Sequence, residues 1–131
     1  LKLINEKNFD GATLNNYSYN IAVRETSSKS DLKIALDYAG QAISLEEDNA
    51  SFLDTVGWLY YLLEDYDMAE YFIIQSLKFS PENAIIYEHL GDIYIKMKKT
   101  GQAQEAYEKA LALDVENKSI VEKLSKVTQD E

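Results

Sequence analysis

The chain has 131 residues, 46% of them hydrophobic and 27% charged, which predicts one folded domain and excludes global disorder. Its net charge of -10 disfavours nucleic acid and anionic membrane surfaces as partners, although many helical proteins are acidic simply to stay soluble. The sequence contains no cysteine, which excludes disulfides and thiolate chemistry. No apolar run approaches the roughly 18 residues of a membrane span, so we expect a soluble protein of either the cytoplasm or the periplasm.

The first part of the chain predicts an irregular pair of helices. Residues 1–10 resemble the tail of a preceding helix, so we expect the natural chain to extend upstream. Residues 11–49 align with the units that follow if Ser18 is the small residue of the first helix. That alignment requires five inserted residues near positions 26–30, where a polar cluster predicts a loop. A gapless alternative places Val23 at the small position.

Two units follow with an internal period of 34 residues. Residues 50–83 superimpose without a gap on residues 84–117, so that Gly57 matches Gly91 and Ala69 matches Ala103. Within each unit the apolar residues recur with helical spacing on either side of a short polar turn, which predicts two antiparallel helices. Three asparagines, spaced 34 residues apart at the ends of the units, are suited to cap the N-terminus of the next helix: Asn49, Asn83 and Asn117.

Small residues within these helices predict close helix crossings. A glycine in the middle of a helix costs about 1 kcal/mol relative to alanine, so Gly57 and Gly91 are best explained by a neighbouring helix that leaves no room for a side chain. Residues 118–131 then predict a C-terminal capping helix, with Ile120, Leu124 and Val127 on its apolar side.

The order small–tyrosine–alanine–aromatic–alanine–proline at this period resembles the tetratricopeptide repeat. The resemblance covers residues 50–117, with departures at Ile73, Ser76 and Val115. It implies an all-α fold: a single domain over residues 1–131, formed as a right-handed α-α superhelix of about three helical hairpins and a capping helix.

The resemblance also implies a concave face, lined by the first helix of each unit, that binds a protein or peptide. The residues that it places there as partner-binding candidates are Asn15, Tyr19, Asp54, Trp58, Tyr61, Glu88 and Asp92. One branch of the family grips a C-terminal carboxylate with cationic residues that are missing here, and the acidic candidates would repel that group. We therefore reject this clamp and expect a partner with apolar and basic groups.

Several alternatives stay open. Trp58 belongs either to the groove or to the core between units, Tyr61 either contacts a partner or packs against the next helix, and the acidic candidates could form a solvated face. The alternative function is a structural spacer or self-assembly module within a longer protein. We expect a monomer or a weak homodimer.

The sequence offers no catalytic or cofactor-binding pattern. His89 is the only histidine, and no G-x-S-x-G segment, calcium loop or glycine-rich phosphate loop accompanies it. We therefore expect no enzyme activity, no metal site and no cofactor.

Overall fold

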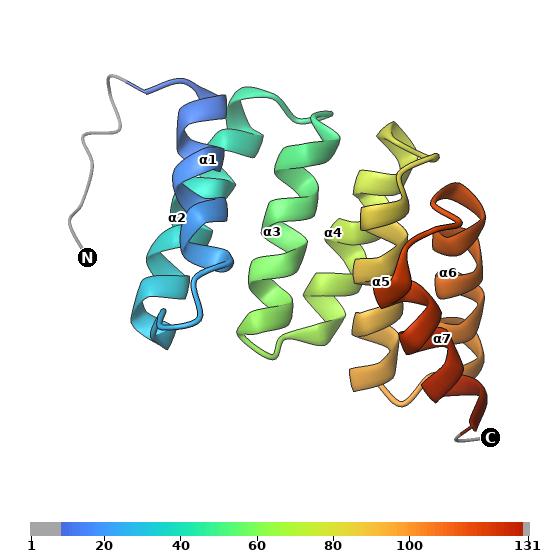
Figure 1. The fold of residues 1–131 in the computed structure, drawn as a ribbon. Coiled ribbons are helices and arrows are strands. Elements are labelled where there is room, and N and C mark those ends of the chain that lie inside the picture. Colours follow the sequence, from blue (N-terminus) through green and yellow to red (C-terminus); the bar gives the residue numbers. More distant parts are fainter. Residues whose placement is uncertain (1–8, 130–131) are drawn as a thin grey trace.

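The computed structural model describes residues 9–129, which form helices and turns throughout (Figure 1). This confirms the all-α prediction. Of the helix tail proposed for residues 1–10, residues 1–8 lie outside the described residues, whereas Phe9 and Asp10 are not helical, and Asp10 caps the first helix. The helices are α1 (Gly11–Ala22), α2 (Lys29–Leu45), α3 (Ala50–Leu62), α4 (Tyr66–Phe79), α5 (Ala84–Lys96), α6 (Thr100–Leu113) and α7 (Lys118–Gln129).

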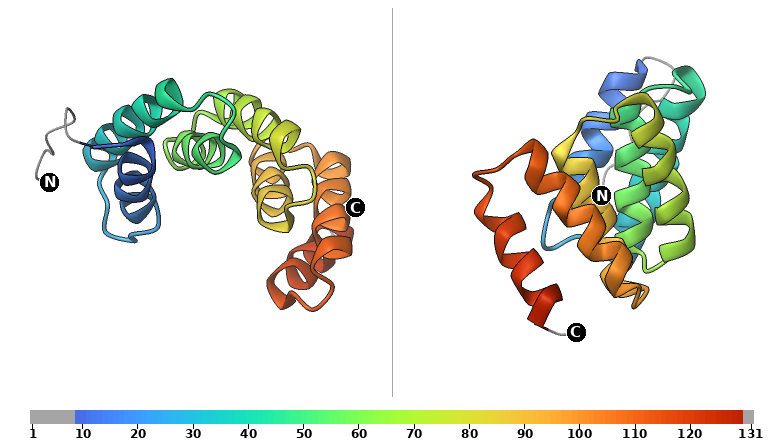
Figure 2. Two further views of the ribbon diagram at one scale, coloured as in Figure 1. Left: turned by 90° about the horizontal axis from the view of Figure 1, so that it is seen from above. Right: turned by 90° about the vertical axis from the view of Figure 1, so that its right-hand side faces the viewer.

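The helices pair as hairpins, α1 with α2, α3 with α4 and α5 with α6, and the hairpins stack side by side. Seen along the helices, the stack curves into an arch (Figure 2). Helices α1, α3, α5 and α7 lie on the inside of the arch, and α2, α4 and α6 lie on the outside. The prediction of a helical solenoid is therefore confirmed.

The predicted asparagine caps are confirmed. The side-chain oxygen of each asparagine accepts a hydrogen bond from the backbone N–H three residues further on, in the first turn of α3, α5 or α7. The donor–acceptor distances are 3.1 Å for Asn49, 3.2 Å for Asn83 and 3.2 Å for Asn117.

The turns within the hairpins differ in length. Three residues join α3 to α4 and α5 to α6, and in each turn the middle residue has a left-handed backbone, with φ of 65° at Glu64 and 60° at Lys98. The first hairpin has a longer turn, residues 23–28, and a longer second helix of 17 residues.

The helices of each hairpin approach closely at the predicted small residues. A Cβ atom added to Gly57 would lie 2.8 Å from the Ile73 side chain, and one added to Gly91 would lie 2.3 Å from the Tyr107 ring. In the first hairpin the buried Ser18 lies at the crossing and donates a 2.8 Å hydrogen bond to the carbonyl of Ala35. The predicted crossings at both glycines are thus confirmed.

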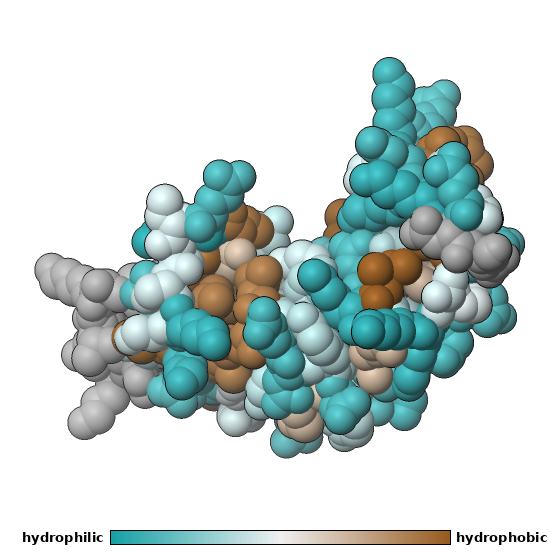
Figure 3. Space-filling model, turned by 90° about the horizontal axis from the view of Figure 1, so that it is seen from below, coloured by the Kyte–Doolittle hydropathy of each residue, from teal (hydrophilic) through white to brown (hydrophobic). Residues whose placement is uncertain are grey.

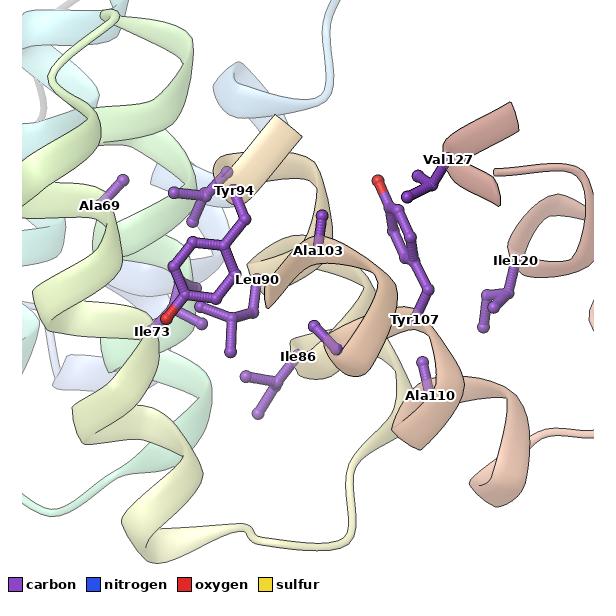
Figure 4. Close-up of a cluster of buried hydrophobic side chains, with 12 residues drawn as sticks. Ala69, Ile73, Ile86, Leu90, Tyr94, Ala103, Tyr107, Ala110, Ile120 and Val127 are labelled. Atoms are coloured by element: carbon purple, nitrogen blue, oxygen red, sulfur yellow. The ribbon is translucent and has the colours of Figure 1, made fainter. Parts of the chain in front are cut away.

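The core continues from one hairpin to the next. Ala69 and Ile73 of α4 pack with Ile86, Leu90 and Tyr94 of α5, which connects the second hairpin to the third. The same cluster extends through α6 to Ile120 and Val127 of α7, as Figure 4 shows. Helix α7 therefore covers the apolar end of the third hairpin within the part of the chain described.

The crossing at Gly91 provides a stability test. Gly91→Ala should destabilise the protein by about 1–3 kcal/mol, because the Tyr107 ring has to move out of a packed position. Gly40→Ala is the matched control: Gly40 is exposed within α2, no atom lies within 4 Å of its added Cβ, and alanine should stabilise the helix by up to about 1 kcal/mol. Urea unfolding of both variants measures the difference, and equal effects would contradict the crossing.

Buried tyrosines predict a loss of stability in alkali. Burial, together with the hydrogen bond and charge of Glu70, raises the pKa of Tyr94 to about 12, whereas an unfolded tyrosine loses its proton near pH 10. The unfolded state therefore releases the proton first, and the free energy of unfolding should fall as the pH rises from about 10 to 12. Thermal melts should show a shallower alkaline decline for Tyr94→Phe than for the wild type; parallel curves would refute the assignment.

Candidate partner-binding surface

Polar and aromatic contacts connect the inner helices of the arch in a repeating pattern. At the last junction, Lys123 of α7 places its Nζ atom 2.7 Å from Glu88 Oε2 and 3.1 Å from Asp92 Oδ2, both on α5. Ser119 of α7 donates a further hydrogen bond of 3.1 Å to Glu88. Two of the predicted acidic residues therefore share one cation of the capping helix.

Asp92 is also held from the outer helix. The hydroxyl of Tyr107, on α6, donates a 2.6 Å hydrogen bond to Asp92 Oδ1. Burial and this hydrogen bond raise the pKa of Tyr107 above its ordinary value. Burial alone would lower the pKa of Lys123, but its hydrogen bonds and charge interactions with Glu88 and Asp92 raise it overall. Lys123 and Tyr107 are thus charged and neutral, respectively, at neutral pH.

One junction earlier, histidine takes the place of lysine. His89 of α5 is 34 residues before Lys123, and its Nδ1 atom lies 2.8 Å from Asp54 Oδ1 on α3. The imidazole ring also stacks on Trp58, with ring centroids 4.1 Å apart. Trp58 stacks in addition on Tyr61 at 4.4 Å. Trp58 is half-buried, and its ring is packed against Tyr61 and His89. Trp58 therefore has features of both the groove and the core interpretation.

The first junction has no such polar contact. Thr55 occupies the place of His89 and Lys123, but it is buried and donates to the carbonyl of Ser51 in its own helix. Asn15 of α1 is only 6% exposed, and its side-chain oxygen accepts no hydrogen bond within residues 9–129. Tyr19, one turn further along α1, is 51% exposed.

A pocket of about 510 Å³ opens beside the junction of α3 and α5, where both helices begin and α4 ends. Asp54 and His89 form part of its wall, and Tyr19, Phe79 and Ile85 contribute exposed apolar surface. Seen from below, the opposite edge of the arch is hollowed between its two ends and carries interspersed hydrophilic and hydrophobic side chains (Figure 3).

The structure therefore separates the seven candidates into four groups. Tyr19 and Asp54 lie together at the pocket, Trp58 and Tyr61 form a stack with His89, and Asn15 is buried. Glu88 and Asp92 lie at the far junction with Lys123, and their side chains are 16% and 14% exposed.

Sequence reasoning missed Lys123 and Phe79 as members of this surface. Lys123 could have been predicted from the sequence, because it lies one 34-residue period after His89. Phe79 ends α4, a helix of the outer layer, so its position at an inner pocket depends on the path of the turn into α5.

Two structural features are absent from residues 9–129. No group of three or more histidine, cysteine, aspartate or glutamate side chains is arranged to hold a metal ion. No helix in this range has the length and apolar character needed to cross a membrane.

Comparison with known proteins identifies the same repeat. A family model described as a tetratricopeptide repeat matches residues 84–117, the span of the third predicted unit. Among curated relatives, the chain is 29% identical over 79 residues to the uncharacterized protein ycf37 of Guillardia theta, covering 60% of this chain and 44% of that protein. It is also 29% identical over 90 residues to the type IV pilus assembly protein PilF of Pseudomonas aeruginosa, covering 67% and 36%. The chain thus spans less than half the length of these relatives.

Solved structures share the fold at low sequence identity. The first tetratricopeptide domain of Spaghetti (RPAP3), bound to an HSP90 peptide, superimposes with a TM-score of 0.83 at 16% identity, covering 92% of each chain. MamA superimposes with a TM-score of 0.81 at 16% identity, covering 92% of this chain and 67% of the other.

The Lys123 contacts predict a specific loss of stability. Lys123→Met should destabilise the protein by about 1–2 kcal/mol, because Glu88 and Asp92 would keep their partial burial and lose their cation. Lys126→Met is the control, since Lys126 is exposed on the same helix. Urea unfolding compares the two variants, and hydrogen exchange should show faster opening of α7 only in Lys123→Met; equal behaviour would disprove the role of the contacts.

Proposed function

We propose that this chain, which belongs to the tetratricopeptide repeat family, is a scaffold that binds a protein or peptide through the inner face of its arch. The observation that carries the proposal is the pocket of about 510 Å³ on that face, bordered by three large apolar side chains that are 51–60% exposed. Exposed apolar side chains around a concavity are typical of surfaces that bind a partner.

The relatives support peptide binding in general terms. The Spaghetti domain that shares this fold binds an HSP90 peptide, and the second domain of human RPAP3 is in complex with an HSP70 peptide. The pocket of this chain is lined by one carboxylate, that of Asp54, and by neither lysine nor arginine. We therefore propose a partner with apolar and basic groups, and binding rather than catalysis as the role of this surface.

The seven candidates have unequal parts in this proposal. Tyr19 and Asp54 are the proposed contact residues, with Trp58 and Tyr61 supporting them through the aromatic stack. Glu88 and Asp92 act through the charge that they share with Lys123, and Asn15 is buried and does not line the pocket. We further propose that the units are residues 11–49, 50–83 and 84–117, followed by the capping helix at 118–131.

Two exposed tyrosines allow a matched test of the inner face. Tyr19 of the inner helix α1 is 51% exposed and lines the pocket, and Tyr71 of the outer helix α4 is 55% exposed. Tyr19→Ala should weaken the binding of peptides that combine leucine with arginine or lysine by about tenfold, while Tyr71→Ala should leave it unchanged. Fluorescence anisotropy of labelled peptides measures both.

The result has a clear contrary outcome. If Tyr71→Ala weakens binding as much as Tyr19→Ala, the inner face is not the binding surface. Sedimentation of the same samples distinguishes the alternative, because a self-assembly module would associate at the same concentrations without any peptide.

A further inference from the structure

The pocket beside Asp54 has a chemical character more specific than its apolar rim. We infer that it receives a cationic side chain of the partner, and that arginine fits it better than lysine. This inference rests on the proposed function, because it names the group by which a peptide on the inner face would be recognised.

The first support is the charge of the pocket wall. Asp54 is the one carboxylate among the lining residues, no lysine or arginine lines the pocket, and His89 is the only other titratable side chain there apart from Tyr19. The Asp54 side chain is 19% exposed, so water shields it incompletely and a cation would gain from contact with it.

The second support is a precedent within the same chain. Glu88 is 34 residues after Asp54 and accepts a hydrogen bond of 2.7 Å from the ammonium group of Lys123. Asp54 instead faces the imidazole of His89, which occupies one oxygen, Oδ1, at 2.8 Å. Its other oxygen accepts no hydrogen bond from the described residues, so Asp54 retains capacity for a second donor. Glu88 accepts two donors, Lys123 and Ser119, both at Oε2.

The third support is the surface around the carboxylate. The aromatic rings of Tyr19 and Phe79 are 51% and 53% exposed, and Ile85 is 60% exposed. These apolar groups can cover the aliphatic stem of a long cationic side chain while its charged end reaches Asp54. A planar guanidinium can also stack on an aromatic face and offer several donors, which favours arginine over the compact ammonium of lysine.

One feature of the pocket opposes a cation. The N-terminal ends of α3 and α5 border it, and helix N-termini favour negative charge. The side chains of Asn49 and Asn83 already accept one N–H of each helix end, and Asp54 supplies a full negative charge nearby. We therefore expect the cation to be preferred, and the competing anion is included in the test.

The test uses the full chain and four acetylated, amidated pentapeptides that differ only in the central residue between leucines. Arginine at the centre should bind about tenfold more tightly than glutamine, with lysine between them, and glutamate should bind most weakly. Asp54→Asn should remove the advantage of arginine over glutamine. Asp37→Asn is the matched control, because it changes net charge equally but lies exposed on the outer helix α2.

The outcomes separate this inference from the proposed function. If all the peptides bind equally to the wild type and Tyr19→Ala weakens them, the inner face binds peptides and the cation site is wrong. Tighter binding of the glutamate peptide would also overturn the cation site, in favour of an anion at the helix ends. If no peptide binds at millimolar concentration, the proposed function itself fails.

Because the comparison between peptides uses unmodified protein, it does not depend on the folding of Asp54→Asn. Amide chemical shifts add the location: the arginine peptide should shift Ser51, Asn83 and Ile85, which line the pocket, and leave α2 and α6 unaffected. Shifts confined to the outer helices would refute the assignment.

Discussion

The close approach of two helices within each hairpin is the constraint on which the rest of the structure depends. At each crossing one helix has a glycine, Gly57 or Gly91, or the short side chain of Ser18. The Ser18 hydroxyl donates a hydrogen bond to the backbone of the facing helix. Close packing at the crossing determines how far apart the paired helices lie, and hence the spacing at which successive hairpins stack. The cost of glycine within a helix is offset by the packing that its absence of a side chain permits.

The crossing also connects the core to the inner face. The Tyr107 ring lies against Gly91, and its hydroxyl continues to Asp92, which Lys123 contacts from α7. One unit earlier Ile73 takes the place of Tyr107 and Trp58 takes the place of Asp92. An isoleucine has no hydroxyl to donate, and the residue that replaces the acid is an aromatic ring stacked on its neighbours. The departure from the family pattern at Ile73 therefore coincides with a change in the surface residue above it.

The architecture was accessible from sequence because its determinants are local and periodic. Asparagine caps depend on hydrogen bonds over three residues, and crossings depend on small residues at fixed positions of a 34-residue period. The pairing of polar side chains across the arch was not accessible in the same way. The period places Asp54 and Glu88 on one face, but which side chain reaches them depends on the length and conformation of His89 and Lys123. The packing of Trp58 could not be predicted for the same reason, because its ring stacks on a histidine that lies 31 residues away.

Because of these contacts, the net charge of the protein does not describe the local charge at each junction of the inner face. The chain carries 23 acidic against 13 basic residues, and this excess acts over long range to attract basic partners, more weakly as salt is added. At contact distance the acids differ. Glu88 and Asp92 share one lysine as a close cation, whereas Asp54 contacts a histidine and has no lysine or arginine beside it in the pocket lining. Under our proposal, a basic group of the partner is drawn to the arch by its net charge and contacts the Asp54 junction, which is also where the exposed aromatic side chains lie. The proposed selectivity of the inner face therefore rests on this difference between junctions, which cannot be obtained from net charge and composition.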